Sequence, residues 1–98
     1  MARITSRWLL RGGIATLGLN QSDGLVLLAI VDRANEQGIA WPSQYKLATD
    51  LGIARSTVQA ALGRLVEHEL LLEHEPGRQG RSARYQLARL PGQLRAVN

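Results

Sequence analysis

The chain has 98 residues, of which 45% are hydrophobic and 20% charged, and these values fit one compact domain rather than a disordered tail. It contains no cysteine, which excludes disulfide frameworks, thiolate metal sites and cysteine nucleophiles. The formal net charge is +4, and eleven of the twelve basic residues are arginine, the side chain that best forms paired hydrogen bonds to phosphates and guanine edges.

The basic residues gather toward the two ends of the chain. Residues 1–11 and 76–98 contain eight arginines and no acid, whereas all eight acidic residues lie between 12 and 75. Charge alone leaves two readings open: contact with a polyanion such as nucleic acid, or a solubilising surface typical of a GC-rich genome.

No segment of the sequence predicts contact with a membrane. The longest apolar run, LVLLAIV at 25–31, is far shorter than the ~20 residues that a membrane-spanning helix needs. The N-terminal apolar stretch is too short for a secretory signal. We therefore expect a cytoplasmic protein.

The first predicted elements are an arm and a helix. Residues 1–19 are predicted to form the arm, and a helix is predicted to begin after the N-cap Asn20 and to run to about Gln37, with Gly38 ending it. The run at 25–31 also fits a buried strand on periodicity, but the polar continuation DRANEQG favours a helix.

A pair of helices is predicted next. Residues 39–41 read as a short extended piece, because Pro42 keeps the residue before it out of the helical conformation. Ser43 can cap a helix at about 44–51, and Gly52 can end that helix. Its predicted packing residues are Tyr45, Leu47, Ala48 and Leu51.

A second helix is predicted at about 55–68, where apolar residues at 3–4 spacing mark one face as core. Two strands, 70–75 and 83–90, then flank the loop PGRQGRS and form a hairpin. The sequence thus divides into the arm, a domain at 20–90 and a C-terminal tail at 91–98.

Seven short motifs follow one another in a fixed order along this part of the chain. They are Trp41-Pro42-Ser43, Leu47-Ala48, Leu51-Gly52-Ile53, Arg55-Ser56-Thr57-Val58, Arg64-Leu65, Gly80-Arg81 and Arg84-Tyr85-Gln86-Leu87. Their order resembles the winged helix-turn-helix superfamily, in particular the domains of phage and plasmid replication proteins and small bacterial transcriptional regulators. The resemblance implies an α+β fold, mostly α, with three main helices, two to three short strands and a β-hairpin wing.

The sequence departs from that family pattern at both ends of the second helix. Ala54 stands where such domains place a Ser or Thr cap, so one capping hydrogen bond is lost. Glu69 stands where they place Gly, and Glu suits a left-handed conformation poorly. We therefore expect this helix to end in a different way.

The N-terminal half of the second helix is the candidate for reading bases. Arg55 and Gln59 are four residues apart and share a face; Arg can bond guanine, and Gln can bond adenine. Ser56 and Thr57 suit phosphate oxygens, although Thr57 could instead pack inward, and Arg64 could reach a phosphate. The alternative is an ordinary amphipathic helix with a solvated polar face.

Two further groups of residues are candidate contacts to the DNA backbone. Ser43, Gln44 and Lys46 open the preceding helix, where their alternative role is capping and solubility. The second group surrounds the wing, where glycines allow close approach to a phosphate backbone or a minor groove, the alternative being a solvated loop. Its members are Arg78, Gln79, Arg81, Ser82 and Arg84.

The remaining polar residues do not predict catalysis. His68 and His74 lie among glutamates, but the chain changes from helix to strand between them, so we expect no metal site. No Ser, His and Asp are spaced as a triad, and we expect neither an enzyme nor a cofactor. Trp8 and Trp41 are interpreted as core or interface anchors.

We predict a sequence-specific protein for double-stranded DNA, a small transcriptional regulator that acts as a homodimer. Two recognition helices would then lie in successive major grooves, ~34 Å apart. Two alternatives stay open: a plasmid or phage replication-initiation or partition (centromere-binding) protein with the same module, and a winged-helix protein-interaction module that does not bind DNA.

Overall fold

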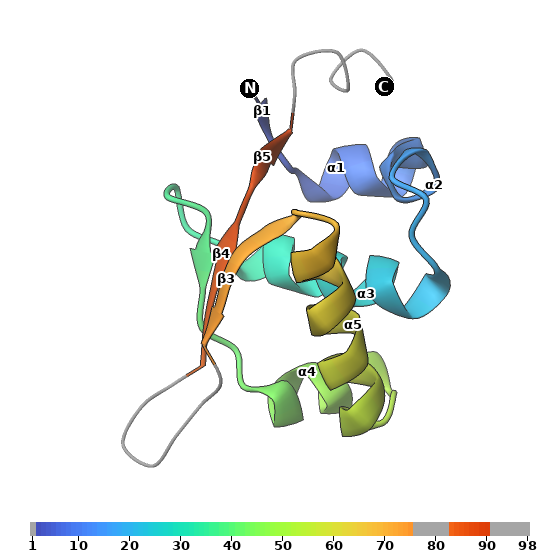
Figure 1. The fold of residues 1–98 in the computed structure, drawn as a ribbon, viewed down its shortest axis with the longest axis vertical. Helices are drawn as coiled ribbons and strands as arrows, with labels where there is room; N and C mark the ends of the chain where they lie inside the picture. The colour runs from blue at the N-terminus through green and yellow to red at the C-terminus, as the bar shows by residue number, and fades with distance from the viewer. Residues whose placement is uncertain (1, 76–82, 91–98) are drawn as a thin grey trace.

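The computed structural model describes residues 2–75 and 83–90, which form a layer of helices packed on a small antiparallel sheet (Figure 1). The α+β class is as predicted. In chain order the elements are β1 (Ala2–Arg3), α1 (Ser6–Trp8), η1 (Leu9–Gly13), α2 (Ile14–Thr16), α3 (Gln21–Arg33), β2 (Ile39–Ala40), α4 (Gln44–Leu51), α5 (Arg55–Glu67), β3 (Leu71–Glu75), β4 (Arg84–Leu87) and β5 (Arg89–Leu90).

The main sheet has the strand order β2-β4-β3, with antiparallel neighbours. β4 is its central strand: Tyr85 pairs with Ala40 on one side and with His74 on the other. The register of β3 on β4 shifts between Leu71 and Glu73, which fits the imperfect alternation of the consecutive leucines in β3. The predicted hairpin is therefore present, and β2 extends it.

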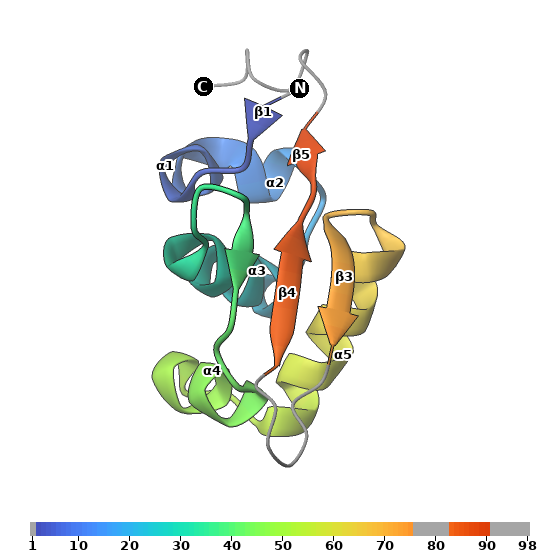
Figure 2. The ribbon, with the colours of Figure 1, turned by 90° about the vertical axis from the view of Figure 1, so that its left-hand side faces the viewer.

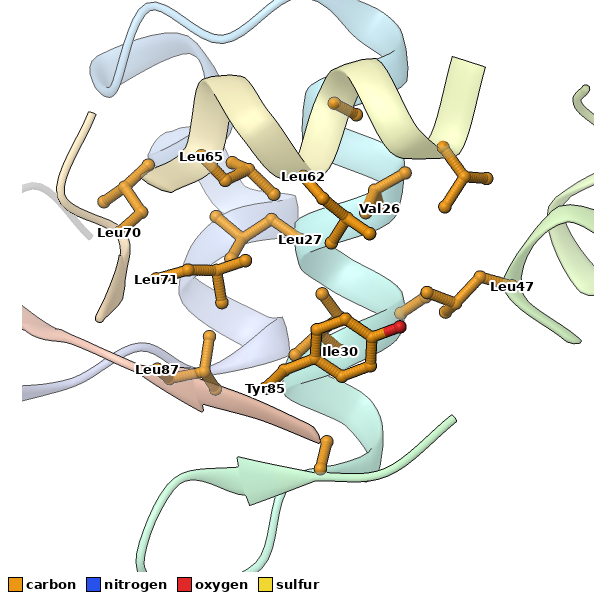
Figure 3. Close-up of a cluster of buried hydrophobic side chains, with 14 of the residues drawn as sticks. Val26, Leu27, Ile30, Leu47, Leu62, Leu65, Leu70, Leu71, Tyr85 and Leu87 are labelled. Carbon is orange, nitrogen blue, oxygen red and sulfur yellow. The ribbon is translucent and has the colours of Figure 1, made fainter. Parts of the chain in front are cut away.

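The hydrophobic core lies between the sheet and α3, α4 and α5 (Figure 3). α3 is the central helix, because its buried residues face both α5 and the sheet. α5 contributes the face that the 3-4 spacing predicted, and β4 contributes alternate residues. The fully or nearly fully buried members include Val26, Leu27, Ile30, Leu47, Val58, Leu62, Leu65, Leu71, Tyr85 and Leu87.

α3 begins as predicted but ends four residues early. Asn20 caps it, since its side chain accepts the Asp23 backbone N–H at 2.8 Å. The last helical residue is Arg33 rather than Gln37. Asn35 is the reason, because its side-chain oxygen accepts the N–H groups of Gln37 and Ile39 at 2.9 and 3.0 Å and closes a local turn.

α4 is bounded as predicted. The Ser43 hydroxyl accepts the Lys46 N–H at 2.9 Å at its start. Gly52 adopts a left-handed conformation (φ 69°) at its end, and the Ile53 N–H then bonds the Ala48 carbonyl at 3.1 Å. These caps fix the sharp turn that leads into α5.

α5 confirms one expected departure and contradicts the other. Ala54 is extended and makes no capping hydrogen bond, as predicted. The expectation of a different C-terminal end is wrong, because Glu69 itself adopts the left-handed conformation (φ 61°). The Glu69 N–H bonds the Val66 carbonyl, and the N–H of buried Leu70 bonds the Leu65 carbonyl, so the geometry that glycine usually supplies is retained.

The N-terminal arm is folded onto the domain. β1 pairs with β5, and Thr5 caps α1 by accepting the Trp8 N–H at 3.1 Å. Trp8 and Leu9 are buried, so Trp8 is a core residue as expected. Gly12 has φ 108° and interrupts the helical turns between α1 and α2.

Candidate nucleic-acid interface

The predicted contact elements lie at one end of the molecule. α4 and the first turns of α5 occupy this end of the molecule. The C-terminal end of β3 and the N-terminal end of β4 also point toward this end in both views (Figures 1 and 2). In the register of the sheet, the backbone of Glu75 at the end of β3 lies opposite that of Arg84 at the start of β4. The remaining predicted wing contacts, Arg78, Gln79, Arg81 and Ser82, lie outside the described residues.

The first two turns of α5 present polar side chains to solvent. Arg55, Ser56 and Gln59 are exposed, and Thr57 is half-buried. Val58, on the opposite side, is fully buried in the core. Helical spacing therefore divides α5 into a buried face and an exposed polar face that carries the two predicted base-reading residues.

The N-terminus of α5 adds partial positive charge to this surface. No side chain of Ala54 caps the helix, so its first backbone N–H groups are left for solvent or an anion. Within the described part of the chain, the exposed Arg55 takes part in none of the ion pairs. Both features suit contact with a phosphate or with a base edge.

The N-terminal turn of α4 lies beside α5 and is joined to it by side chains. The Gln59 amide Nε2 donates a hydrogen bond to the Gln44 Oε1 at 2.9 Å. The predicted backbone contact Ser43 is exposed and caps α4, the alternative role weighed for it. Lys46 is also exposed, and its ammonium lies 3.3 Å from an Asp50 carboxylate oxygen. Asp50 pairs with Arg33 as well, so part of the positive charge of α4 is neutralised.

Arg64 holds α5 against α3. Its Nε lies 2.9 and 3.1 Å from the two carboxylate oxygens of Asp23, and its Nη2 lies 2.8 Å from one of them. The Asp23 side chain is only 3% exposed. The hydrogen bonds that Arg64 donates to the Asp23 carboxylate raise the pKa of Arg64, while burial opposes that shift. The predicted phosphate contact of Arg64 stays a prediction; the contact present in the fold is the one with Asp23.

Two large aromatic side chains near this surface are exposed. Trp41 is 51% exposed, so it is not a core residue, and its predicted role as an interface anchor stays a prediction. Tyr45, expected to pack, is 69% exposed, and that prediction is wrong. Trp41 directly follows β2, and Tyr45 lies in the first turn of α4. Sequence spacing could not separate them from core residues, because Trp41 adjoins the buried Ala40 and Tyr45 lies three positions before the buried Ala48.

Arg84 lies at the start of β4 and is partly buried.

Among residues 2–75 and 83–90, no group of three or more His, Cys, Asp or Glu side chains could hold a metal ion. In the same ranges, no helix is both long enough and apolar enough to cross a membrane.

Comparison with known proteins gives a family, a relative and a structural neighbour. Residues 17–71 match a family described as a helix-turn-helix domain. The chain is 35% identical over 68 residues to Protein YmfN of Escherichia coli (strain K12); the match covers 69% of this chain and 15% of that protein. The chain thus spans only about 15% of the length of this curated relative.

A crystal structure of a transcriptional regulator of the MarR family from Silicibacter pomeroyi has a similar fold. The TM-score is 0.58 at 24% sequence identity, and the match covers 93% of this chain and 56% of that chain. This similarity confirms the predicted winged-helix architecture, in which α4 and α5 are the two helices of the helix-turn-helix.

Proposed function

The chain belongs to the helix-turn-helix domain family, and we propose on that premise that it binds double-stranded DNA with sequence preference through α4, α5 and the β3–β4 hairpin. One observation carries the proposal. The first two turns of α5 expose Arg55, Ser56 and Gln59 at the end of the molecule where α4, the end of β3 and the start of β4 also lie.

The dimensions and chemistry of α5 support a place in the major groove. An α-helix with side chains is ~10–12 Å wide, and the major groove of B-DNA is ~12 Å wide. In this arrangement Arg55 bonds guanine O6 and N7, and Gln59 bonds adenine N6 and N7. Ser56, Lys46 and the wing residues Arg78 and Arg81 contact phosphates, which position the protein without reading sequence.

We propose that this DNA-binding activity serves transcriptional regulation in the cytoplasm, with two copies bound to two half-sites. The similarity of the fold to a regulator of transcription supports this role. A replication or partition protein would use the same surface, and the sites selected from a random duplex pool distinguish the roles. A palindrome indicates a two-fold dimer that regulates, whereas tandem direct repeats indicate an origin or a centromere-like array.

Fluorescence anisotropy with labelled random duplex at several salt concentrations tests DNA binding. We expect affinity to fall steeply with salt, with a log-log slope of about −0.9 per neutralised phosphate. Binding that is absent or insensitive to salt would favour the protein-interaction module instead.

A pair of arginine variants then tests the placement of the surface. Arg55→Ala should weaken binding and should relax the preference at one base pair by ~1–3 kcal/mol. Arg11→Ala is the matched control, because Arg11 is an exposed residue of η1 and its loss removes the same charge. η1 joins α1 to α2, and these two helices lie at the other end of the molecule (Figure 1). Equal losses of affinity in both variants would contradict this placement of the DNA.

A further inference from the structure

We propose that Gln44 is a positioning residue for base recognition, which fixes the amide of Gln59 so that Gln59 selects adenine over guanine. This inference rests on the proposed DNA-binding function and adds a residue of α4 to the recognition of a base. It concerns the α4–α5 hydrogen bond at the exposed surface.

The bond joins two helices at the polar surface rather than in the core. Gln59 Nε2 donates to Gln44 Oε1 at 2.9 Å, an ordinary hydrogen-bond length. Gln44 is half-buried in the first turn of α4, whereas Gln59 is exposed on the second turn of α5. At such a position water can satisfy both amides, so the bond adds little to folding stability. Its main effect is to restrict the rotation of the Gln59 amide.

The direction of the bond determines what Gln59 can offer to DNA. A glutamine amide has one carbonyl oxygen that accepts and one NH₂ group with two hydrogens to donate. Because Gln59 gives one hydrogen to Gln44, the amide keeps its oxygen as an acceptor and a second hydrogen as a donor. This pair matches the adenine N6 amino group and N7.

The reverse bond would produce the opposite preference. If Gln44 donated to the Gln59 oxygen, Gln59 would present two hydrogens and a partly occupied acceptor. Two donors match guanine, whose major-groove edge offers the acceptors O6 and N7. A free Gln59 could rotate between the two arrangements, so loss of the Gln44 acceptor should reduce the discrimination of adenine from guanine.

Three variants separate this role from a general structural one. Gln44→Met keeps the length of the side chain but removes the acceptor. Gln44→Glu can only accept, so it preserves the direction of the bond while its negative charge repels phosphates. Gln59→Met removes the base contact itself. Melting temperatures close to that of the parent check that each variant folds.

The measurement is anisotropy on the duplex selected from a random pool, compared with the same duplex carrying a single A·T to G·C change at the position that Gln59→Met identifies. We expect the parent to prefer adenine there by about 5- to 150-fold. Gln44→Met should lower this ratio by about tenfold or to unity. Gln44→Glu should bind both duplexes more weakly but retain the parental ratio. A fourth variant that combines Gln44→Met with Gln59→Met should behave as Gln59→Met alone.

The outcomes distinguish this inference from the proposed function. Salt-insensitive or absent binding by the parent overturns both. A parent that binds duplex with salt dependence, but whose adenine-to-guanine ratio is unchanged in Gln44→Met, overturns the positioning role alone. So does a Gln44→Met effect at a different base pair from that of Gln59→Met, or a preference other than adenine at the Gln59 position.

Discussion

At the scale of single residues, Trp8 and Gly13 pack so closely that only hydrogen fits between them. A Cβ atom on Gly13 would lie 2.5 Å from the Trp8 Cε3 atom and 2.7 Å from the Trp8 carbonyl oxygen. We expect Gly13→Ala to lower the free energy of unfolding by ~1–3 kcal/mol, because the buried indole cannot move without disturbing its neighbours. Urea denaturation measures the loss.

Gly63→Ala is the matched control for this substitution. Gly63 lies inside α5, and a Cβ there would meet nothing within 4 Å. Alanine favours the helix over glycine, so this variant should gain ~0.5–1 kcal/mol. A Gly13→Ala protein as stable as the parent would show that the N-terminal turns do not pack as described.

The buried Tyr85 hydroxyl should make the free energy of unfolding fall at alkaline pH. Burial raises the pKa of Tyr85 to about 12, from about 10 in the unfolded chain. The folded protein therefore holds this proton more tightly, and its contribution to stability is complete below about pH 10 and is lost between about pH 10 and 12. We expect a loss of roughly 2 kcal/mol over that window in urea denaturation. Tyr85→Phe should lack this part of the pH dependence, and equal curves for both proteins would refute the assignment.

The residues of the candidate surface were predictable only where they depend on local spacing. The four-residue interval between Arg55 and Gln59 places both on the exposed face of α5, as the sequence indicated. Arg64 lies on the same helix and was also predicted to face DNA. In the structure its side chain instead donates hydrogen bonds to Asp23, which lies 41 positions earlier in the chain. Only the packing of α5 on α3 brings these two charges together, so the pair could not be read from the sequence.

At the scale of elements, α5 lacks a capping side chain at its start. Ala54 already has the extended backbone of an N-cap (φ −68°, ψ 147°). We expect Ala54→Ser to raise the free energy of unfolding by ~1 kcal/mol, because the new hydroxyl can accept a first-turn N–H. Thermal denaturation measures the gain. Ala60→Ser, at an exposed site within the same helix, is the control and should not stabilise; an equal gain in both variants would exclude capping as the cause.

Element types were predictable where short-range signals agree. Ser43 and Gly52 bound α4 as expected, because a cap and a left-handed glycine act within a few residues. The end of α3 was missed because the side chain of Asn35 competes with the helix for backbone N–H groups. The pairing of β1 with β5 was missed because strands of two residues carry no periodic pattern.

At the scale of the whole molecule, the proposed mode of binding predicts that the positive charge of the hairpin contributes more to affinity for DNA than to sequence preference. We expect Arg78→Ala with Arg81→Ala to weaken binding to all duplexes and to reduce the salt slope by about 1.8, or about 0.9 for each lost phosphate contact. Anisotropy across a salt series measures both changes. Arg7→Ala with Arg11→Ala is the control, because it removes equal charge from two exposed side chains of the N-terminal arm. Wing variants that bind random duplex as tightly as the parent would show that the hairpin does not contact DNA.

The antiparallel pairing of Ala2 with Leu90 places the two ends of the described fold together, away from α4 and from the start of α5 (Figure 2). A dye attached at Ala2 or at Leu90 would therefore lie on the side remote from the proposed DNA. Immobilisation through that side should leave the recognition helix accessible, which makes the protein suitable for surface-based measurements of duplex capture.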